Sequence, residues 1–335
     1  MRFLLDRGAK SGQNRGMSLR AHLFDASGQD QDIECAAVTL TQLTNQQLLW
    51  VHLEHPSDEE VTRARTWFEL KTSPLPTPAR RPVLYQTDTA TWVQVWCVNA
   101  GDPVEQAVSL TLVARPNAVL TMAPAPIDFL DEFRRGVKAD TALGQLDAAA
   151  FLAALLGRHV SSYLFSLEPL EETVDQLDAR TLTQGTSPEL LRDLAQVRER
   201  IGDLCRLLVS HRRVYSVLAR PDFVAFTGDD PEPHLQALVA EYEHTVDSLE
   251  NARNLVLGSF DLYTARATLR TNQVMSVLTV TTVALGVLAT MAGFLGTNFD
   301  ASIFKSGDRG FVQAIALSLL LVSSLLILIR WRRWL

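Results

Sequence analysis

The chain has 335 residues, of which 47% are hydrophobic, and its formal net charge is −7. A negative net charge provides no basic surface for a phosphate backbone, so the composition excludes nucleic acid as a partner. The three cysteines, Cys35, Cys97 and Cys205, are widely spaced and form no metal or redox motif, which predicts free thiols in a cytosolic domain.

The first 139 residues predict an N-terminal tail, 1–16, followed by a cytoplasmic α/β domain, 17–139. The chain begins MRFLLDRGAK, which lacks an apolar core long enough for a secretory signal. Ser57 and Glu60 have the spacing of a capping box and predict a helix that ends near Leu70. Turn-forming residues separate β-rich runs that predict a small, partly antiparallel sheet, at 21–24, 48–53, 91–98, 108–113 and 118–122.

Residues 140–232 predict a pair of cytoplasmic helices. The first runs from about Ala142 to Thr183, and Pro169 should kink or interrupt it. Ser187 followed by Pro188 predicts the start of the second, because Ser is favoured at the N-cap and Pro at the first helical position. A stretch rich in helix breakers, 220–233, ends it.

The next segment, 233–273, predicts a stalk helix. Apolar residues recur at three- and four-residue steps from Leu235 to Tyr263, and no proline follows before the first long apolar span. The simplest interpretation is one continuous helix of about 60 residues, close to 90 Å long, whose second half enters a membrane.

Two uncharged apolar spans follow, 274–295 and 310–329. Each is about 30 Å long as a helix, which matches the hydrocarbon thickness of a bilayer. Neither span has the wide polar face of a helix on a soluble core. Together they predict a transmembrane hairpin with a loop at 296–309 and a basic tail at 330–335, in a chain that contains no other window of eighteen apolar residues.

The charges at the ends of the hairpin predict its orientation. The loop 296–309 has no net charge, and Trp331 and Trp334 lie where an interfacial aromatic belt is expected. Because cytoplasmic flanks are rich in Lys and Arg, both termini are expected in the cytoplasm, with two spans in the inner or plasma membrane. The flanking basic residues are Arg266, Arg270, Arg330, Arg332 and Arg333.

The residues around the first span have a recognisable pattern. The span begins within NQVMSVLT, 272–279, and ends in AGFLGTNF, 292–299, while residues 242–263 read YEHTVDSLENARNLVLGSFDLY and the chain ends in RRWL. These segments resemble the CorA/ZntB family of divalent-cation transporters, in which the first membrane helix ends in Gly-Met-Asn or, in the ZntB branch, Gly-x-Asn. Arg81-Pro82 and the strand after it match the family's N-terminal domain more loosely.

The resemblance implies a fold class and an assembly. It implies an α+β cytoplasmic domain followed by a long α-helical stalk and two C-terminal transmembrane helices, in a funnel-shaped homopentamer. The first membrane helices of five copies would line one pore, and the second would face the lipid bilayer. The residues agree, since small and hydroxyl side chains concentrate in 274–295 and bulky aliphatic ones in 310–329.

The resemblance also assigns residues to the pore. Met275 and Leu278 would form apolar rings that gate the pore by dewetting. The family often has a threonine where this chain has Ala289, and here a threonine, Thr290, follows one position later. The candidate pore-lining residues share one helix face: Asn272, Met275, Leu278, Thr282, Gly286 and Ala289.

The predicted selectivity filter is Gly296, Thr297 and Asn298. Gly296 would allow a close approach of the backbone to the axis. A ring of Asn298 amides would bind a dication through its retained water, which suits Mg²⁺ because Mg²⁺ dehydrates reluctantly. Asp300 would add an acidic ring at the entrance that concentrates cations. Thr297 replaces the usual methionine and leaves the branch of the family open.

Other interpretations remain beside these. Asn298 could serve simply as the cap of the helix. The threonines within 279–282 could serve simply to bond to the helix backbone in a contact between helices. The histidines, including His52, His211 and His244, show no metal-ligand spacing. An acidic helix face is either solvated surface or a sensor of internal metal, and consists of Glu168, Glu171, Glu172, Asp175 and Asp178.

Three hypotheses follow for the function. The first is transport of Mg²⁺, with Co²⁺ or Ni²⁺, through a pentameric pore with the cation as substrate and no cofactor. The second is Zn²⁺ transport of the ZntB type, with or without proton coupling. The third is a membrane-anchored coiled coil that transports nothing. An enzyme is not expected, because no nucleophile–base or metal–carboxylate set stands out.

Overall fold

The structure is a computed structural model that describes residues 19–25, 30–33, 40, 43–44, 46–70, 81–136, 148–218, 220, 232–296 and 308–331. Its contacts divide the chain into two compact units. Unit 1 comprises Met1–Asp175 and Asp193–Leu257, and unit 2 comprises Gln176–Arg192 and Gly258–Leu335.

Unit 1 contains a seven-stranded sheet with the strand order β2-β1-β3-β7-β6-β5-β4. The β3–β7 pair is parallel and the other pairs are antiparallel, which confirms the prediction of a partly antiparallel sheet. The strands are β1 (Leu19–Asp25), β2 (Gln31–Ile33), β3 (Gln47–Glu54), β4 (Val83–Gln86), β5 (Thr91–Cys97), β6 (Val108–Arg115) and β7 (Ala118–Ala123). A short 3-10 helix, η2 (Val104–Gln106), precedes β6.

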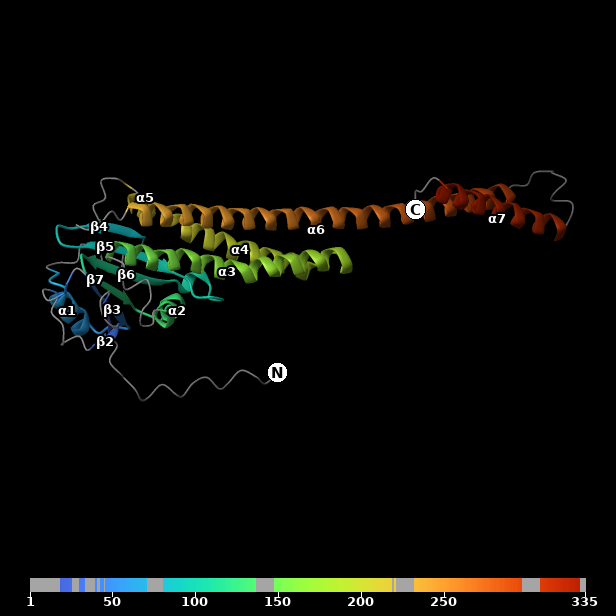
Figure 1. The fold of residues 1–335 in the computed structure, drawn as a ribbon. Helices are drawn as coiled ribbons and strands as arrows, with labels where there is room; N and C mark the ends of the chain where they lie inside the picture. Colours follow the sequence, from blue (N-terminus) through green and yellow to red (C-terminus); the bar gives the residue numbers. More distant parts are fainter. Residues whose placement is uncertain are drawn as a thin grey trace, which may run out of the picture. The chain divides into compact units, whose positions relative to one another are not determined.

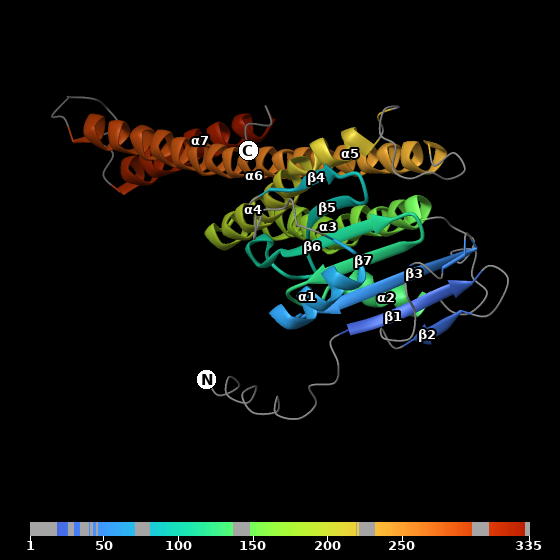
Figure 2. The ribbon, with the colours of Figure 1, turned by 90° about the vertical axis from the view of Figure 1, so that its left-hand side faces the viewer.

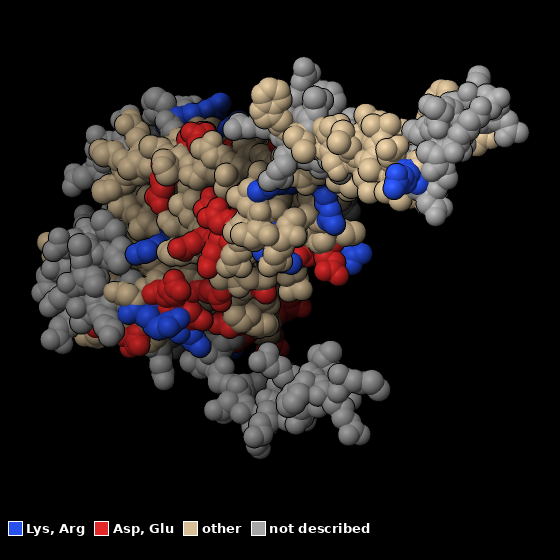
Figure 3. Space-filling model, turned by 90° about the vertical axis from the view of Figure 1, so that its right-hand side faces the viewer, with Lys and Arg blue, Asp and Glu red and all other residues tan. Residues whose placement is uncertain are grey.

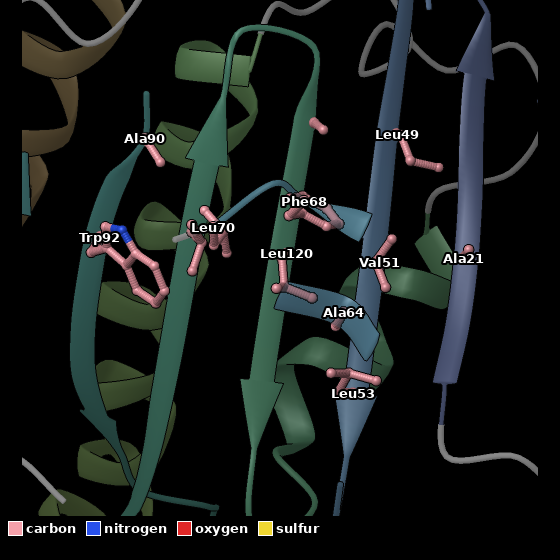
Figure 4. Packing of buried hydrophobic residues seen from close by; sticks show 12 residues of the cluster. Ala21, Leu49, Val51, Leu53, Ala64, Phe68, Leu70, Ala90, Trp92 and Leu120 are labelled. Atoms are coloured by element: carbon pink, nitrogen blue, oxygen red, sulfur yellow. The ribbon is translucent and has the colours of Figure 1, made fainter. Parts of the chain in front are cut away.

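Helix α1 (Asp58–Trp67) covers one face of the sheet. Its capping box is present, since Ser57 Oγ accepts from the Glu60 N–H and a Glu60 carboxylate oxygen accepts from the Ser57 N–H, which confirms the prediction. Alternate strand residues point to this face because successive side chains of a strand point to opposite sides. Figure 4 shows the resulting core, which includes Leu49, Val51, Leu53, Ala64, Phe68, Trp92 and Leu120.

The other face of the sheet packs against helices α2 (Asp128–Gly136) and α3 (Ala148–Gln184). The Trp50 ring lies 5.6 Å from the Phe133 ring and 5.7 Å from the Phe151 ring, centroid to centroid. Phe24 and Phe151 lie 5.5 Å apart. These aromatic side chains bury a large apolar area and join the sheet to both helices.

Helix α3 runs without a break through Pro169, so of the predicted kink or interruption the interruption is wrong. Proline removes the N–H that would bond to the carbonyl of Phe165, and its ring crowds that carbonyl. Both residues are exposed, so water can reach this turn of the helix. The Thr173 hydroxyl donates to the Pro169 carbonyl at 2.7 Å. The helix therefore tolerates a proline on its solvent side.

The expected helical pair contains a third, short helix. Helix α4 (Pro188–Ser210) ends just before His211, and α5 (Arg212–Leu218) begins just after it. At this break the His211 ring bonds to the backbone on both sides. Its Nδ1 lies 2.8 Å from the Leu207 carbonyl, and its Nε2 accepts from the Trp96 N–H at 2.9 Å. Sequence periodicity missed this break, which depends on a contact between residues 115 positions apart.

A buried polar network joins strand β5 to helices α3, α4 and α5. The Trp96 carbonyl accepts from the Tyr163 hydroxyl at 2.8 Å and from His159 Nε2 at 2.9 Å. His159 Nδ1 lies 2.8 Å from the Tyr215 hydroxyl. Burial lowers the pKa of His159 to about 4 and that of His211 to about 3, so both rings are neutral at neutral pH.

The longest element is α6 (Glu232–Leu295), one helix of 64 residues, which confirms the predicted continuous helix. Its first part belongs to unit 1, where Tyr242 stacks on Tyr215 at 4.3 Å and donates to the Leu208 carbonyl at 3.0 Å. At 1.5 Å per residue the helix is about 96 Å long.

Unit 2 joins the end of α3 and the start of α4 to the later part of α6. The Ser259 hydroxyl donates to Asp178 at 3.0 Å, and the Tyr263 hydroxyl donates to the Ser187 carbonyl at 2.9 Å. Arg266 donates to the Leu182 carbonyl at 3.2 Å. Helix α7 (Asp308–Trp331) lies alongside the C-terminal part of α6 in both views (Figures 1 and 2). It begins at Asp308, two residues before the predicted end of the loop at 309.

Candidate functional site

The apolar part of α6 is exposed, whereas an apolar helix in a protein core is buried. Among the described residues, two helices contain an 18-residue window with the hydropathy of a membrane span. The window in α3 has a mean hydropathy of 1.3 and is 67% buried, as expected of a helix in a protein core. The window in α6 has a mean hydropathy of 2.0 and is 0% buried, so it needs a cover other than water.

Helix α7 has the same character as the end of α6. Its described apolar stretch is Arg309–Ser324. Phe311 is 69% exposed, and the large aliphatic residues Leu319, Leu320 and Ile327 are exposed as well. The charged side chains visible in Figure 3 gather instead on the α/β unit. A bilayer can cover such a pair of helices, because the backbone N–H and C=O groups of a helix bond to each other and need no water.

One face of the apolar part of α6 is partly covered. Its half-buried residues recur every three or four positions, which places them on one side of the helix. These residues are Ser276, Val280, Ala284, Val287 and Met291.

The predicted pore-lining residues occupy a different face, which is uncovered. Met275 is 56% exposed and Leu278 58% exposed, and the other members of the set are exposed too. At 3.6 residues per turn, the centre of this set lies roughly 150° around the helix from the centre of the half-buried face. The structure therefore brings Asn272, Met275, Leu278, Thr282, Gly286 and Ala289 together on one uncovered stripe.

Threonine hydroxyls along this part of α6 all donate to the helix backbone. The Thr279, Thr281 and Thr282 hydroxyls donate to carbonyls four residues earlier at 2.8, 2.9 and 2.8 Å. The Thr290 hydroxyl donates to the Gly286 carbonyl at 2.8 Å. Such bonds satisfy the hydroxyl proton inside an apolar segment, where water is absent.

Two glycines of α6 leave space at its surface. A Cβ atom at Gly286 or Gly293 would meet nothing within 4 Å. Gly296 follows the last helical residue, and its N–H donates to the Ala292 carbonyl at 3.0 Å. A Cβ there would lie 3.4 Å from that same carbonyl oxygen. Of the predicted mouth residues, Gly296 is described, whereas Thr297, Asn298 and Asp300 lie outside the described residues.

A cavity of about 300 Å³ in unit 1 was missed by sequence reasoning. It lies between the turn that contains η2 and helix α4, where Arg200 donates to the Gly101 carbonyl at 3.2 Å. Its acids are Asp102, Glu105, Glu199 and Asp203, none of which belongs to the predicted acidic face. The described part of the chain contains no group of three or more His, Cys, Asp or Glu side chains that could hold a metal ion.

The architecture defines a class of protein: a mixed α/β unit continued by one very long helix into an apolar C-terminal hairpin. A family model described as "CorA-like Mg2+ transporter protein" matches residues 45–333. The chain therefore belongs to the CorA-like family of membrane transporters for divalent cations. The activity of this family is transport, with the cation as substrate.

Individual relatives agree with the family. The cobalt/magnesium transport protein CorA of Thermotoga maritima is 24% identical over 240 residues, which span 69% of this chain and 65% of that protein. The divalent cation transporter CmaX of Pseudomonas aeruginosa is 23% identical over 92% of this chain and 93% of its own length. The complete CorA magnesium transporter of Methanocaldococcus jannaschii shares the fold, with a TM-score of 0.72 at 17% identity over 96% of this chain and 99% of that chain.

Proposed function

We propose that this protein takes up Mg²⁺ through a homopentameric pore that selects the hydrated ion. The observation that supports the proposal most is the uncovered stripe of α6, which lies opposite the half-buried face in the uncharged part of the helix, 274–295. The stripe places the Asn272 amide, the Thr282 hydroxyl and the small residues Gly286 and Ala289 on one face, which a helix surrounded only by lipid does not need. A helix that lines a water-filled passage needs polar and small residues on the face toward the water.

Several copies are required, because one hairpin cannot enclose a passage. In the proposed ring, the uncovered stripe of α6 faces the axis and α7 lies outside against lipid. Five copies follow from the family resemblance, in which five first membrane helices line the pore. Both termini would lie in the cytoplasm, as the Arg residues at the outer flanks of the hairpin favour.

Selection of the ion is assigned to the mouth formed by Gly296, Thr297 and Asn298. Five Asn298 amide oxygens would accept hydrogen bonds from the water shell of the ion. Mg²⁺ keeps several waters when proteins bind it, so an outer-shell contact distinguishes it from ions that bind side chains directly. Asp300 would raise the local cation concentration at this mouth.

The membrane potential would supply the driving force. Moving one charge through 100 mV is worth about 2.3 kcal/mol, so a dication gains about 4.6 kcal/mol. The chain contains no GxxxxGK[ST] sequence for a nucleotide phosphate, which agrees with uptake driven by potential alone.

Zinc is the alternative ion. Zn²⁺ prefers Cys, His and carboxylate ligands, and the two spans 274–295 and 310–329 contain none of these residues. A dehydrated zinc site within the membrane is therefore not supported, whereas Zn²⁺ passing with its water would use the same route as Mg²⁺. A measurement of ion uptake distinguishes Mg²⁺ from Zn²⁺ as the substrate, since membership of the family does not.

Ion uptake into proteoliposomes containing the purified protein tests the proposal. Mg²⁺, Zn²⁺, Co²⁺ and Ni²⁺ are supplied singly and in competition, with Asn298→Ala as the variant and empty liposomes as the control. We expect saturable Mg²⁺ uptake that the variant loses or no longer discriminates. Unchanged selectivity in Asn298→Ala would refute the filter, and a mass below five subunits in detergent would refute the pentamer.

A further inference from the structure

Helices α3 and α4 form a hairpin whose tip, residues 182–187, is attached to α6 shortly before the apolar span begins. Arg266 donates to the Leu182 carbonyl at 3.2 Å, and the Tyr263 hydroxyl donates to the Ser187 carbonyl at 2.9 Å. The tip and this part of α6 belong to the same unit, unit 2. At 1.5 Å per residue, Arg266 lies about 12 Å along the helix from the start of the span, so the tip is held close to the expected membrane surface.

Arg270 continues the side of α6 that contacts the hairpin. Ser259, Tyr263 and Arg266 bond to α3 or to the turn after it, and they lie within roughly 60° of one another around the helix. Arg270 falls within roughly the same 60° and lies about 6 Å closer to the span than Arg266. Helix α3 ends at Gln184, about 3 Å beyond its contact with Arg266, so Arg270 extends past the hairpin. Arg270 is exposed, and its side chain forms no ion pair or hydrogen bond within the described part of the chain.

The charged side chains around the end of the hairpin are all positive. The segment 179–187 contains Arg180, the segment 262–273 contains Arg266 and Arg270, and neither segment contains an acid. The nearest acids along these elements lie further from the span and are Asp178, Glu189 and Asp261. Clusters of basic residues immediately cytoplasmic of a membrane span attract anionic lipids. The end of the hairpin therefore offers an anion a site that no acid within it neutralises.

The position of these arginines matches the headgroup layer of a bilayer. The hydrocarbon core is about 30 Å thick and the whole bilayer about 40–45 Å, so each headgroup layer is about 5–8 Å deep. Arg270 lies about 6 Å along α6 from Val274, the first residue of the span, which places it at the depth of the lipid phosphates. Leu182 is 49% exposed and Leu269 56% exposed. Apolar side chains beside arginines suit the boundary between headgroups and acyl chains.

We infer that the corner between the hairpin tip and α6 binds the phosphate of an anionic membrane lipid through Arg270 and Arg266. A guanidinium can form two parallel hydrogen bonds to a phosphate. Arg266 has five N–H donors, so it can hold the Leu182 carbonyl and the lipid together. The bound lipid would attach the hairpin to the membrane surface. The inference goes beyond the proposed function, because it depends on the membrane hairpin and not on the pore or its ion.

Native mass spectrometry of the full chain in neutral detergent tests the inference, because the mass shift identifies and counts bound lipid. The protein is titrated with phosphatidylglycerol, with phosphatidylcholine of the same acyl chains as the neutral lipid and glycerol 1-phosphate as the soluble phosphate. We expect phosphatidylglycerol to bind most tightly and Arg270→Gln to raise its half-saturating concentration about tenfold, through loss of a charge-assisted bond. Arg253→Gln is the matched control, an exposed arginine of α6 about 26 Å further from the span, and should stay within about twofold of the unchanged protein.

Three results would overturn the inference. Equal binding of the two lipids would mean that the charge of the headgroup is not recognised. Equal weakening by Arg270→Gln and Arg253→Gln would mean that only the net charge of the protein matters. Binding of glycerol 1-phosphate as tight as that of phosphatidylglycerol would assign the corner to a soluble phosphate. None of these measurements involves ion uptake, so the lipid site and the proposed transport function succeed or fail separately.

Discussion

The backbone N–H of Trp96 donates to the Nε2 atom of His211 at 2.9 Å, and the two residues lie on strand β5 and at the break between α4 and α5. Because Nδ1 of the same ring lies 2.8 Å from the Leu207 carbonyl, His211 must be neutral with its proton on Nδ1. The ring of His159 lies 5.0 Å away and is also neutral. This pair of neutral rings attaches the sheet to the helices of unit 1.

The first prediction concerns pH. An unfolded histidine titrates near 6.5, whereas burial and the neighbouring His159 lower the pKa of folded His211 to about 3. Between these two pKa values the unfolded state therefore binds more protons than the folded state. The contribution of neutral His211 to the free energy of unfolding is complete above about pH 6.5 and decreases as the pH falls. At pH 5 the loss is of order 2 kcal/mol for His211.

His211→Gln tests this dependence, because glutamine keeps one acceptor and one donor but does not titrate. We expect the fall in the unfolding temperature between pH 7 and pH 5 to become smaller in the detergent-solubilised variant than in the unchanged protein. His244→Gln, at an exposed position, is the matched control and should keep the full dependence. An identical pH dependence in all three proteins would contradict the role of His211.

The second prediction concerns the buried hydroxyl of Thr121. Its oxygen accepts from Trp50 Nε1 at 3.0 Å and lies 2.9 Å from His52 Nδ1, in a part of the sheet that water does not reach. Thr121→Val keeps the shape and leaves the indole N–H without this acceptor, so the free energy of unfolding should fall by about 1–3 kcal/mol. Chemical denaturation measures it. The exposed Thr62→Val should change the free energy by less than about 0.5 kcal/mol, and equal effects would contradict the argument.

The third prediction concerns the proline inside α3. Since the helix continues through Pro169, an alanine there would regain a backbone N–H that can donate to the Phe165 carbonyl. We expect Pro169→Ala to raise the free energy of unfolding by about 1–3 kcal/mol. A decrease, measured in the same denaturation experiment, would indicate that the proline is needed for the local path of the helix.

Local signals in the sequence predicted much of the fold. The capping box at Ser57 and Glu60 and the unbroken α6 depend on neighbouring residues alone, and both are confirmed. Strand β2 was missed because three residues are too few for an alternation to be recognised. Helix α2 was missed although its apolar residues, Phe129, Leu130 and Phe133, share one helix face. The break at His211 depends on Trp96, a distant residue that no local pattern contains.

The candidate site divides in the same way. The residues of the uncovered stripe were assigned from the family resemblance, and helix periodicity adds only that they share one face. That the half-buried face lies on the other side required the coordinates, because the half-buried residues Val280, Val287 and Met291 are as apolar as the exposed ones. The filter residues Thr297 and Asn298 and the entrance residue Asp300 remain predictions from the family pattern.

The central claim is that the uncovered stripe of α6 faces water, and cysteine accessibility tests it most directly. Ala289→Cys on the stripe and Val287→Cys on the half-buried face are made in a background in which Cys35 and Cys205 are replaced by Ser and Cys97 by Ala. A charged, membrane-impermeant thiol reagent is added during Mg²⁺ uptake into proteoliposomes. We predict that it modifies Ala289→Cys and blocks uptake, and that it leaves Val287→Cys unmodified and active. Modification of Val287→Cys with protection of Ala289→Cys would contradict the account.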